Sequence, residues 1–578
     1  MSLGCRSVEE GSGWGETKTN ARGVDMSGAS SLSLSRSRAR HGYYTRGSKR
    51  FEKRGVAERE EEEEEEEEDV VGPSVQRPLS SVIKAALVSR LVTVALCAAF
   101  DSLLDDFDTS AHLAFPTCFT DLSSSSARGE TERANVTSWG IDTDVGGGGE
   151  FVTERESGYG GALAGAIAQA LARWVRGAVV WDGVHFVRIC QCGYEFDHHI
   201  AFLPLWPLAM RTVAKWVVTP LIAFLERVSS SAFQASSTSG FQLQIGDAFG
   251  CALSGIILSN AFFVLSSVSL FRLGKRLGLS DSLAFRACLL YACNPATVFY
   301  SAIYTESMYN FLHFEALVHL FKERESLFSV SFSTVLMAAA TFTRSNGILT
   351  CVIVLASRLR HCLRACLRKI SSRGGYRKGG GSHVVIFRCE GKELNQFLKQ
   401  IGMAAIQCLA IVAPFYLYQV SFQVSWCQSY QRGMTSLSQD AREEALDEMG
   451  SSWCKGSPYL PKVYQSIQAK YWDVGLFRFY KLSQLPNFLL AFPIWLCTSF
   501  EVYQSVKSSL FPDPRVLVQL HTLVNNSKAF GQLVLCLHWM LMCLVSILIM
   551  NVQVSTRFLS TCAPLYFVTS KMTSEKER

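Results

Sequence analysis

The residue types best suited to chemistry gather in one segment, Trp181 to Arg211, which lies between strongly apolar stretches. Charged side chains are costly in hydrocarbon, so a cluster of this kind indicates a site at a membrane surface. Asp182 is the first candidate for a general base, because a partly desolvated carboxylate can take a proton from a hydroxyl group. The alternative is an N-cap aspartate at the start of an interfacial helix. The local sequence favours neither.

His185 lies three residues after Asp182 and would share a helix face with Arg188. Such a face suits a phosphate or carboxylate partner. A solvated helix face is the alternative for the same spacing. His185 is therefore a candidate contact to a polar substrate.

A second polar run contains Glu195, Asp197, His198 and His199. Its composition is typical of metal sites, but the spacing lacks the HExxH pattern of a helical zinc site. We assign no metal to it. His198 is a weaker candidate for contact with a sugar hydroxyl or a phosphate oxygen, and an exposed polar turn is the alternative.

Three further charged residues stand where apolar segments end. Glu306 follows the helix-breaking Asn294-Pro295 pair and lies where two helices should meet. Arg344 and Arg557 each lie at the rim of an apolar segment, and the arginine fork suits the oxygens of a lipid phosphate. A hairpin turn for Glu306 and snorkelling for the arginines are the alternatives.

Bulk composition indicates a polytopic membrane protein. The chain has 578 residues, of which 48% are apolar and 18% charged, with a mean hydropathy of +0.16. Polar terminal stretches with such an average imply long apolar segments elsewhere. The net charge of +6 is small for this length, so nucleic-acid binding has no support. No cleavable signal peptide is visible, so the first span should direct insertion into the endoplasmic reticulum membrane.

The apolar pattern predicts an all-α fold with about ten transmembrane helices. The expected spans lie near residues 82–99, 248–271, 284–302, 307–321, 327–342, 348–359, 401–420, 486–500, 533–550 and 558–569. Residues 202–225 contain three prolines and two basic residues, so we expect them to be interfacial or re-entrant rather than to cross.

The expected organisation has three parts. Residues 1–80 should be a disordered cytosolic tail, residues 81–570 the membrane domain, and residues 571–578 a polar tail. The membrane domain divides further into a variable lumenal loop (101–180), the candidate catalytic segment (181–211), a basic cytosolic loop (357–400) and a lumenal loop (421–484).

Charge orients these segments. The basic loop should be cytosolic by the positive-inside rule, and counting spans from it places the candidate polar residues on the lumenal side. Cys427 and Cys454 lie in a polar lumenal loop and suggest a disulfide, whereas most of the nineteen cysteines lie in apolar segments, where cysteine behaves as a small hydrophobe.

Long blocks of this sequence resemble the second mannosyltransferase of GPI-anchor assembly (GPI mannosyltransferase 2), a GT-C membrane glycosyltransferase. The similarity covers about Val82 to Leu565. The blocks are WDGVHF with GYEFDHHIAFLPLWPL, NPATVFYSAIYTES, TRSNGIL, YWDVGLFRFYKLSQLPNFLLAFP and NVQVSTRFLS.

The resemblance implies lumenal catalytic loops and transfer of an α-1,6-linked mannose from dolichyl phosphate mannose to a GPI lipid that already carries one mannose. Inversion at the sugar would then need one base, for which Asp182 matches the Trp-Asp motif. Carried over in the same way, Arg344 and Arg557 would contact phosphate, and Glu306 and Asn346 are secondary candidates. Trp181, His185 and His198 complete the expected substrate contacts.

The implied partners are the lipid-linked donor, the GPI-lipid acceptor and the membrane, with an accessory membrane subunit as a further expectation. No cofactor is implied. Three alternatives stay open: another transferase that uses a dolichyl-phosphate sugar, a non-catalytic multi-pass subunit, and a transporter. A transporter would bind its substrate near the bilayer midplane, whereas the polar groups here are expected at one rim.

Overall fold

The computed structural model describes residues 73–103, 118, 174–175, 177–233, 247–323, 326–373, 391–433, 452–455, 459–510 and 516–576. Regular structure in these ranges is helical throughout, which confirms the expected all-α class. The compact unit that contains them runs from Val71 to Arg578.

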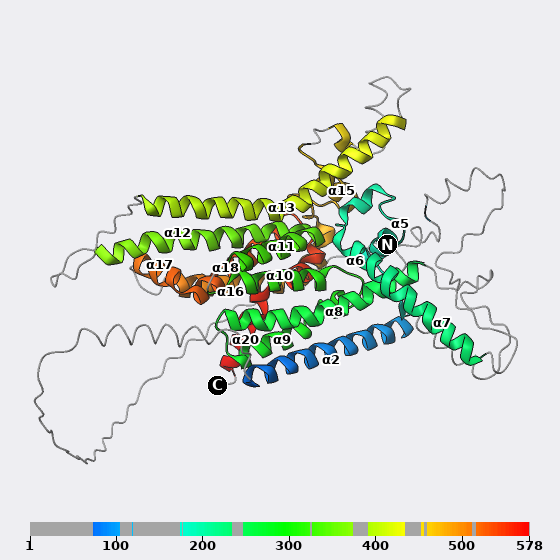
Figure 1. The fold of residues 1–578 in the computed structure, drawn as a ribbon, viewed down its shortest axis with the longest axis horizontal. Helices are drawn as coiled ribbons and strands as arrows, with labels where there is room; N and C mark the ends of the chain where they lie inside the picture. Colours follow the sequence, from blue (N-terminus) through cyan, green and yellow to red (C-terminus); the bar gives the residue numbers. More distant parts are fainter. Residues whose placement is uncertain are drawn as a thin grey trace, which may run out of the picture. The chain divides into compact units, whose positions relative to one another are not determined.

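Helices of 10 to 42 residues form the frame of the molecule, and several of them run side by side (Figure 1). They are α2 (Pro73–Leu103), α7 (Thr219–Phe233), α8 (Asp247–Arg276), α9 (Asp281–Ala292), α10 (Glu306–Leu320), α11 (Leu327–Thr343), α12 (Cys351–Arg373), α13 (Lys392–Gly433), α16 (Leu485–Leu510), α17 (Val516–Asn525), α18 (Ser527–Leu548) and α20 (Ala563–Lys576).

Short helices join the frame near the candidate site. They are α5 (Asp182–Cys192), η3 (Asp197–Ala201), α6 (Leu205–Val213), η4 (Ala214–Val218), η5 (Thr297–Tyr300), η6 (Ser345–Thr350), η7 (Ser452–Lys455), α15 (Val463–Trp472), η8 (Leu482–Gln484), η9 (Val552–Val554) and α19 (Ser555–Leu559).

Helix α10 lies at the centre of the packing, between α8 and α11. All of its residues except Phe311 and His319 are buried, polar ones included. A helix surrounded by protein needs no lipid-spanning length, which explains why α10 can be short. It begins at Glu306, so the N-terminus of this central helix carries a charged side chain.

The expected ten spans are not confirmed. Within the described residues, seven helical segments are long and apolar enough to cross a membrane: Pro78–Phe100, Leu205–Leu225, Asp247–Arg276, Ser345–Arg364, Leu394–Gln428, Leu482–Ser508 and Ser527–Leu548. Four predicted spans, near 284–302, 307–321, 327–342 and 558–569, form shorter helices, and the seven include Leu205–Leu225, which was not expected to cross. The helices near 284–302, 307–321 and 558–569 pack into the core. Apolar sequence there builds the core rather than a lipid contact.

The segment expected to be interfacial differs as well. Leu205–Leu225 is one continuous helical stretch of 21 residues, long and apolar enough to cross. Pro207 lies in the first turn of α6, where its missing N–H costs no helical hydrogen bond. Its exposed side chains include Trp216 and Leu208, which are 71% and 55% exposed and provide an apolar face.

Several expected boundaries also shift. Helix α2 starts at Pro73, inside the expected tail, and the rest of residues 1–80 lies outside the described residues. Most of the loop expected at 101–180 lies outside them too. Helices α12 and α13 extend into the expected loops at 357–400 and 421–484, and α20 continues to Lys576.

Candidate active site

Asp182 is the first residue of helix α5, and the residue before it has an unusual backbone. Trp181 is the N-cap residue and has a φ of 51°. Positive φ at a bulky residue costs on the order of 1–3 kcal/mol and is found mostly at functional sites. Because Trp181 occupies the cap, capping does not account for Asp182. The Asp182 carboxylate instead pairs with Arg557, with 2.7 Å between Oδ2 and Nη1.

Arg557 joins this carboxylate to a second one. It lies in the short helix α19, and its Nε donates to Glu306 Oε1 in a short contact. One guanidinium therefore bridges two carboxylates that are 124 residues apart in the sequence. The fixed fork of arginine makes such a bridge possible.

Glu306 is fully buried and has two cationic partners. Besides Arg557 it contacts Arg344, whose Nη1 lies 2.6 Å from Glu306 Oε1. Arg344 Nη1 also donates to Thr305 Oγ1 at 2.9 Å. The other carboxylate oxygen, Oε2, is buried and has no hydrogen-bond partner among the described residues. The Glu306 carboxylate thus holds both arginines through Oε1, and its Oε2 makes no hydrogen bond to a described residue.

The four charged side chains form one group that we call the charged quartet: Asp182, Glu306, Arg344 and Arg557. Its formal charges cancel. Exposure separates the two carboxylates, because the Asp182 side chain is 30% exposed whereas that of Glu306 is 0% exposed. Only Asp182 is open to a substrate hydroxyl.

Electrostatics fix the charge of the central arginine. Burial acts to lower the pKa of Arg557, but the Glu306 and Asp182 carboxylates outweigh that effect and raise it above its ordinary value. The guanidinium therefore stays protonated throughout the physiological range. Its carbon also lies 4.7 Å from the ring centre of Tyr304 and 5.2 Å from that of Phe299, which adds cation–π attraction.

The turn after α11 places Arg344 and Asn346. Both polar atoms of the Asn346 side chain are buried without a hydrogen-bond partner among the described residues. The next residue must be glycine, because a Cβ at Gly347 would lie 2.5 Å from Thr341 Cα. The backbone of this turn is thus packed against α11, and the unsatisfied Asn346 amide lies two residues after Arg344 of the charged quartet.

Trp181 offers an aromatic surface to this area. Its side chain is 61% exposed, and its ring centre lies 6.4 Å from that of Phe299. Tyr304 OH donates to the Val180 carbonyl at 3.1 Å, which ties the chain before Trp181 to the residues before α10. Exposed rings of this kind can pack against the apolar faces of sugars.

His185 and His198 approach each other with a third histidine. The ring centres of His185 and His198 are 5.2 Å apart, and His199 lies 5.7 Å and 4.7 Å from them. Burial, followed by the charges of His198, His185 and Arg188, lowers the pKa of His199 to about 2. His199 is therefore neutral at physiological pH.

Arg188 is not placed as its spacing predicted. It is buried and pairs with Glu195, with 2.7 Å between Nη2 and Oε2. Two buried opposite charges neutralise each other, so Arg188 supports the fold around α5 rather than facing a phosphate. Asp197, by contrast, is 17% exposed and accepts hydrogen bonds from Tyr471 and Lys470.

Sequence reasoning missed several supporting contacts. Cys190 of α5 forms a disulfide with Cys251 of α8, and Cys192 forms one with Cys118. The expected Cys427–Cys454 disulfide is confirmed, although Cys427 lies in α13 and Cys454 in η7 rather than in a loop. The C-Q-C pattern after WDGVHF was the available signal for the other two.

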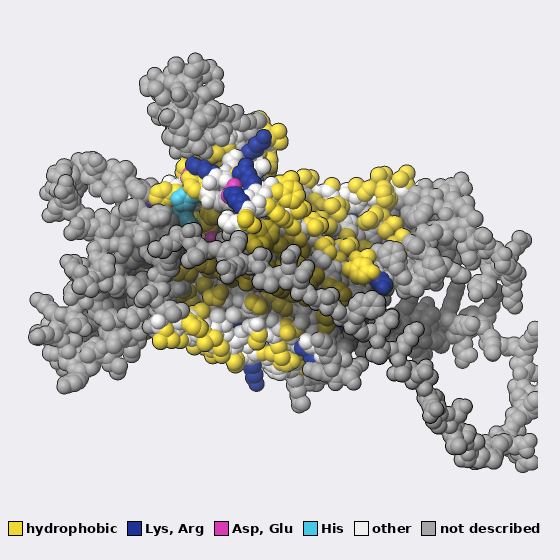
Figure 2. Space-filling view, turned by 180° about the vertical axis from the view of Figure 1, so that it is seen from behind, with side chains coloured by type: hydrophobic (Ala, Val, Ile, Leu, Met, Phe, Trp, Pro, Cys, Tyr) yellow, Lys and Arg dark blue, Asp and Glu magenta, His cyan; other side chains and the backbone are white. Residues whose placement is uncertain are grey.

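One face of the described surface carries a group of polar side chains. Figure 2 shows Lys, Arg, His and acidic side chains close together on this face, a few Lys or Arg side chains apart from them, and hydrophobic side chains over much of the rest. A broad apolar surface of this kind suits a protein that lies in a bilayer.

Comparison with known families identifies the chain. The family model "Mannosyltransferase (PIG-V)" matches residues 155–374 and 386–578, which include all four members of the charged quartet. The chain belongs to this family. The resemblance seen in its sequence blocks is thereby confirmed, and the protein is a mannosyltransferase-family glycosyltransferase of the membrane.

Curated proteins similar to this PIG-V family member are also named as mannosyltransferases. GPI alpha-1,6-mannosyltransferase 2 of Rattus norvegicus is 28% identical over 428 residues, covering 70% of this chain and 75% of the relative. The Homo sapiens protein of the same name is 26% identical over 427 residues, with the same coverage. GPI mannosyltransferase 2 of Drosophila melanogaster is 26% identical, and the match covers 69% of this chain and 80% of the relative.

A solved structure shows only a weak likeness to this PIG-V family member. An oligosaccharyltransferase of Archaeoglobus fulgidus superposes with a TM-score of 0.30 and 11% identity, covering 65% of this chain and 42% of the other. These values support no conclusion about shared fold. The GT-C architecture of this chain stays a prediction from the family resemblance.

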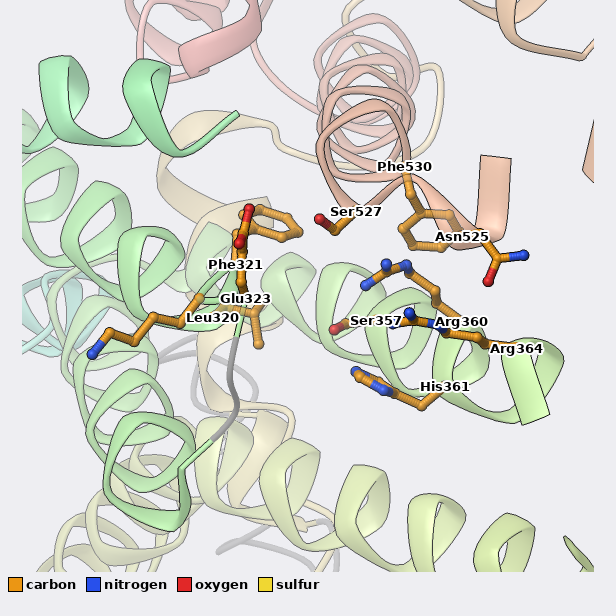
Figure 3. A pocket seen from close by; sticks show the side chains of 11 residues that line it. Leu320, Phe321, Glu323, Ser357, Arg360, His361, Arg364, Asn525, Ser527 and Phe530 are labelled. Carbon is orange, nitrogen blue, oxygen red and sulfur yellow. The ribbon is translucent and has the colours of Figure 1, made fainter. Parts of the chain in front are cut away.

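A pocket of about 300 Å³ in this mannosyltransferase-family chain lies away from the charged quartet. Figure 3 shows its lining, which includes Leu320, Arg360 and Arg364. Leu320 ends α10, and Glu306 begins it. Fourteen helical steps at 1.5 Å put the two ends about 21 Å apart. The pocket is therefore separate from the candidate active site.

Proposed function

We propose that this protein transfers mannose in α-1,6 linkage from dolichyl phosphate mannose to a GPI lipid that carries one mannose, and so adds the second mannose of the anchor. The names of the curated relatives support the acceptor and the linkage. The observation that carries the chemistry is the charged quartet, in which one accessible carboxylate lies beside two arginines.

Asp182 is the base in this proposal. It is the exposed carboxylate of the charged quartet, and it would accept the proton of the acceptor hydroxyl as that oxygen attacks the anomeric carbon of the donor. Bond formation to the hydroxyl oxygen and cleavage of the bond to dolichyl phosphate would occur on opposite faces of the sugar. A β-linked donor then gives an α-linked product.

Arg344 and Arg557 stabilise the leaving phosphate in the proposed step. Each already donates to Glu306, and each guanidinium has further N–H groups that this contact does not use. Cations that are held in place before the reaction lower the barrier because they need no reorganisation as charge develops. Glu306 is thus a positioning residue. The donor brings its own phosphate leaving group, so no cofactor takes part in this step.

Trp181 and Asn346 would bind the sugars. An exposed indole can lie against a mannose ring, and a buried amide without partners can pair with sugar hydroxyls. His185 and His198 lie further along α5 and η3, at the border of the same area.

We propose that the reaction takes place on the lumenal side of the endoplasmic reticulum membrane. The three disulfides support this orientation, because disulfides persist in oxidising compartments. Two of them involve cysteines of α5, the helix that begins with Asp182.

Asp182→Asn tests the proposal. In cells that lack the second mannose transfer, the wild type should restore surface GPI-anchored proteins, whereas Asp182→Asn should reduce transfer by at least about 100-fold, the scale of general-base catalysis. Restored surface protein and the accumulated single-mannose lipid are the measurements.

Asp281→Asn is the matched control, because it makes the same change at the start of α9. It should rescue like the wild type. Normal transfer by Asp182→Asn at equal abundance would contradict its role as base. Failure of the wild type to consume the single-mannose lipid would contradict the proposed acceptor.

A further inference from the structure

Three histidines converge beside the candidate active site, although their spacing along the chain matches no metal-binding motif. His185 comes from α5, and His198 and His199 come from η3. One ring nitrogen from each lies within 4.8 Å of those of the other two. Residues 193–196, which join the two helices and include Gly193 at a φ of 83°, reverse the chain so that the rings meet, and linear spacing could not show the cluster.

His199 lacks the hydrogen bonds that a buried imidazole needs. Its side chain is 0% exposed, and neither ring nitrogen has a hydrogen-bond partner in the described part of the chain. Nε2 of His198 is also buried without one. An unsatisfied buried polar group costs about 1–3 kcal/mol, so several together indicate a missing ligand.

The surroundings fit a cation. Nδ1 of His198 faces Asp197 Oδ1 at 3.8 Å, and that carboxylate is held by Tyr471 and Lys470. A carboxylate behind a histidine is the usual second layer of a metal site, since it orients the ring and raises its basicity.

The neighbouring positive charges are already compensated. Arg188 pairs with Glu195 at 2.7 Å, and Lys470 lies 3.2 Å from Asp197. A metal ion would therefore meet imidazole nitrogens in a locally neutral region. The aromatic rings of Phe202 and Trp472 enclose His185 at 4.7 Å and 6.5 Å between ring centres, which limits access by water.

We propose that His185, His198 and His199 bind one first-row transition-metal ion, with Zn²⁺ the best fit. Three imidazoles suit this ion and leave a fourth position for water or a phosphate oxygen. Zn–N bonds of about 2.0–2.1 Å require the nitrogens to lie about 3.4 Å apart, so small side-chain rotations complete the site.

The ion would act as a positioning device. It would link α5, one turn after Asp182, to η3, which in turn is bonded to α15 through Asp197. The metal ion and the Cys190–Cys251 disulfide would then both fix the position of α5, the helix that begins with Asp182. Metal binding is a property of the purified chain, and its measurement does not depend on the proposed transfer activity.

The test uses the full-length protein, purified in detergent without chelator, and measures bound metal by mass spectrometry. About one zinc ion per chain is expected for the wild type. His199→Phe keeps a ring of similar size but removes both nitrogens, so it should fold and lose the ion. His521→Gln, in α17, is the control and should retain it.

A second measurement adds the ion back, and so also detects a site that has lost its ion during purification. After chelation and buffer exchange, Zn²⁺ or Co²⁺ should raise the midpoint of thermal unfolding of the wild type, and Co²⁺ should give the visible absorption of a tetrahedral site; His199→Phe should show neither effect. If His199→Phe does not fold, His198→Phe takes its place. A wild type that neither carries nor responds to either ion would overturn the proposal, as would an unchanged metal content in a folded variant. The cluster would then be aromatic packing around bound water.

Discussion

At the scale of residues, exposure to solvent distinguishes the roles of the two carboxylates in the charged quartet. Glu306 has no access to solvent and holds two arginines, whereas Asp182 is partly open and holds one. Removing one partner of a buried ion pair costs about 3–5 kcal/mol, because the other charge stays buried alone. Variants in this group must therefore be measured for stability as well as activity.

Arg557→Lys tests the bridging geometry. Lysine keeps the positive charge but cannot contact Asp182 and Glu306 through a planar fork. We expect transfer to fall by about 100- to 1000-fold, the effect of losing a fixed donor to a developing charge. The measurement is mannose transfer in membranes at matched abundance.

Arg272→Lys provides the control for that variant. Arg272 also pairs with a glutamate, Glu315 at 2.7 Å, but is half exposed and lies in α8. Its substitution should leave transfer unchanged. Equal transfer by Arg557→Lys and the wild type would show that charge alone suffices.

Asn346→Ala separates a binding role from a structural one. The amide has no partner in the described residues, so its removal should leave thermal stability equal or higher. If the amide binds a sugar hydroxyl, transfer should still fall by roughly 10- to 100-fold, equivalent to the loss of one buried hydrogen bond. The measurements are transfer rate and unfolding midpoint; loss of stability without loss of transfer would contradict the binding role.

At the scale of elements, the site depends on where helices begin and end. Helices α5 and α10 each begin at a carboxylate, α11 ends one residue before Arg344, and α19 is a single short helix around Arg557. Acidic side chains at helix N-termini are favoured by the helix dipole. The same positions place their charges at the edge of the apolar bundle.

Gly347→Ala tests the turn after α11. A Cβ there would lie 2.5 Å from Thr341 Cα, and the backbone of α11 cannot move without repacking its contacts with α10 and α13. We expect a loss of about 1–3 kcal/mol or more, with reduced transfer because Arg344 moves. The measurement is the fraction of monodisperse protein after heating.

Gly402→Ala is the matched control, since Gly402 lies in α13 with nothing within 4 Å of the added Cβ. Alanine in a helix interior is better than glycine by about 0.5–1 kcal/mol. The control should be at least as stable as the wild type, and a Gly347→Ala protein of wild-type stability would refute the close packing.

At the scale of the whole molecule, orientation decides whether the site meets its substrates. Helix α13 contains a segment long enough to cross, Leu394–Gln428, so the chain before and after it should lie on opposite sides. Cys427, the second-last residue of that segment, forms a disulfide with Cys454 beyond it, which puts the later side in an oxidising compartment.

Glycosylation reports this orientation directly. The sequence contains a natural N-glycosylation sequon, Asn135-Val136-Thr137, in the loop expected to be lumenal, and Asn135→Gln removes it. In that background, a sequon inserted after Leu460 should be glycosylated, whereas one inserted after Gly391 should not. Leu460 is 74% exposed, so the acceptor is accessible. The measurement is a mobility shift removed by endoglycosidase H, and a glycan on the Gly391 insertion would reverse the proposed topology.

The sequence by itself determined the class of the protein and its candidate residues. Apolar segments separated by charged rims require a helical membrane protein, because every backbone polar group must be bonded within the bilayer. Polar residues that interrupt such segments are costly, so Asp182, Glu306, Arg344 and Arg557 stood out one by one.

Only the tertiary structure decided how these residues combine. Arg557 and Glu306 are 251 residues apart, and no local pattern shows that they form a buried contact. Burial by neighbouring helices also decided that α10 is core rather than a lipid-facing span, and that three histidines share one centre. Local spacing determines which side chains share a helix face, whereas packing between distant helices determines which charges meet and which remain open to a substrate.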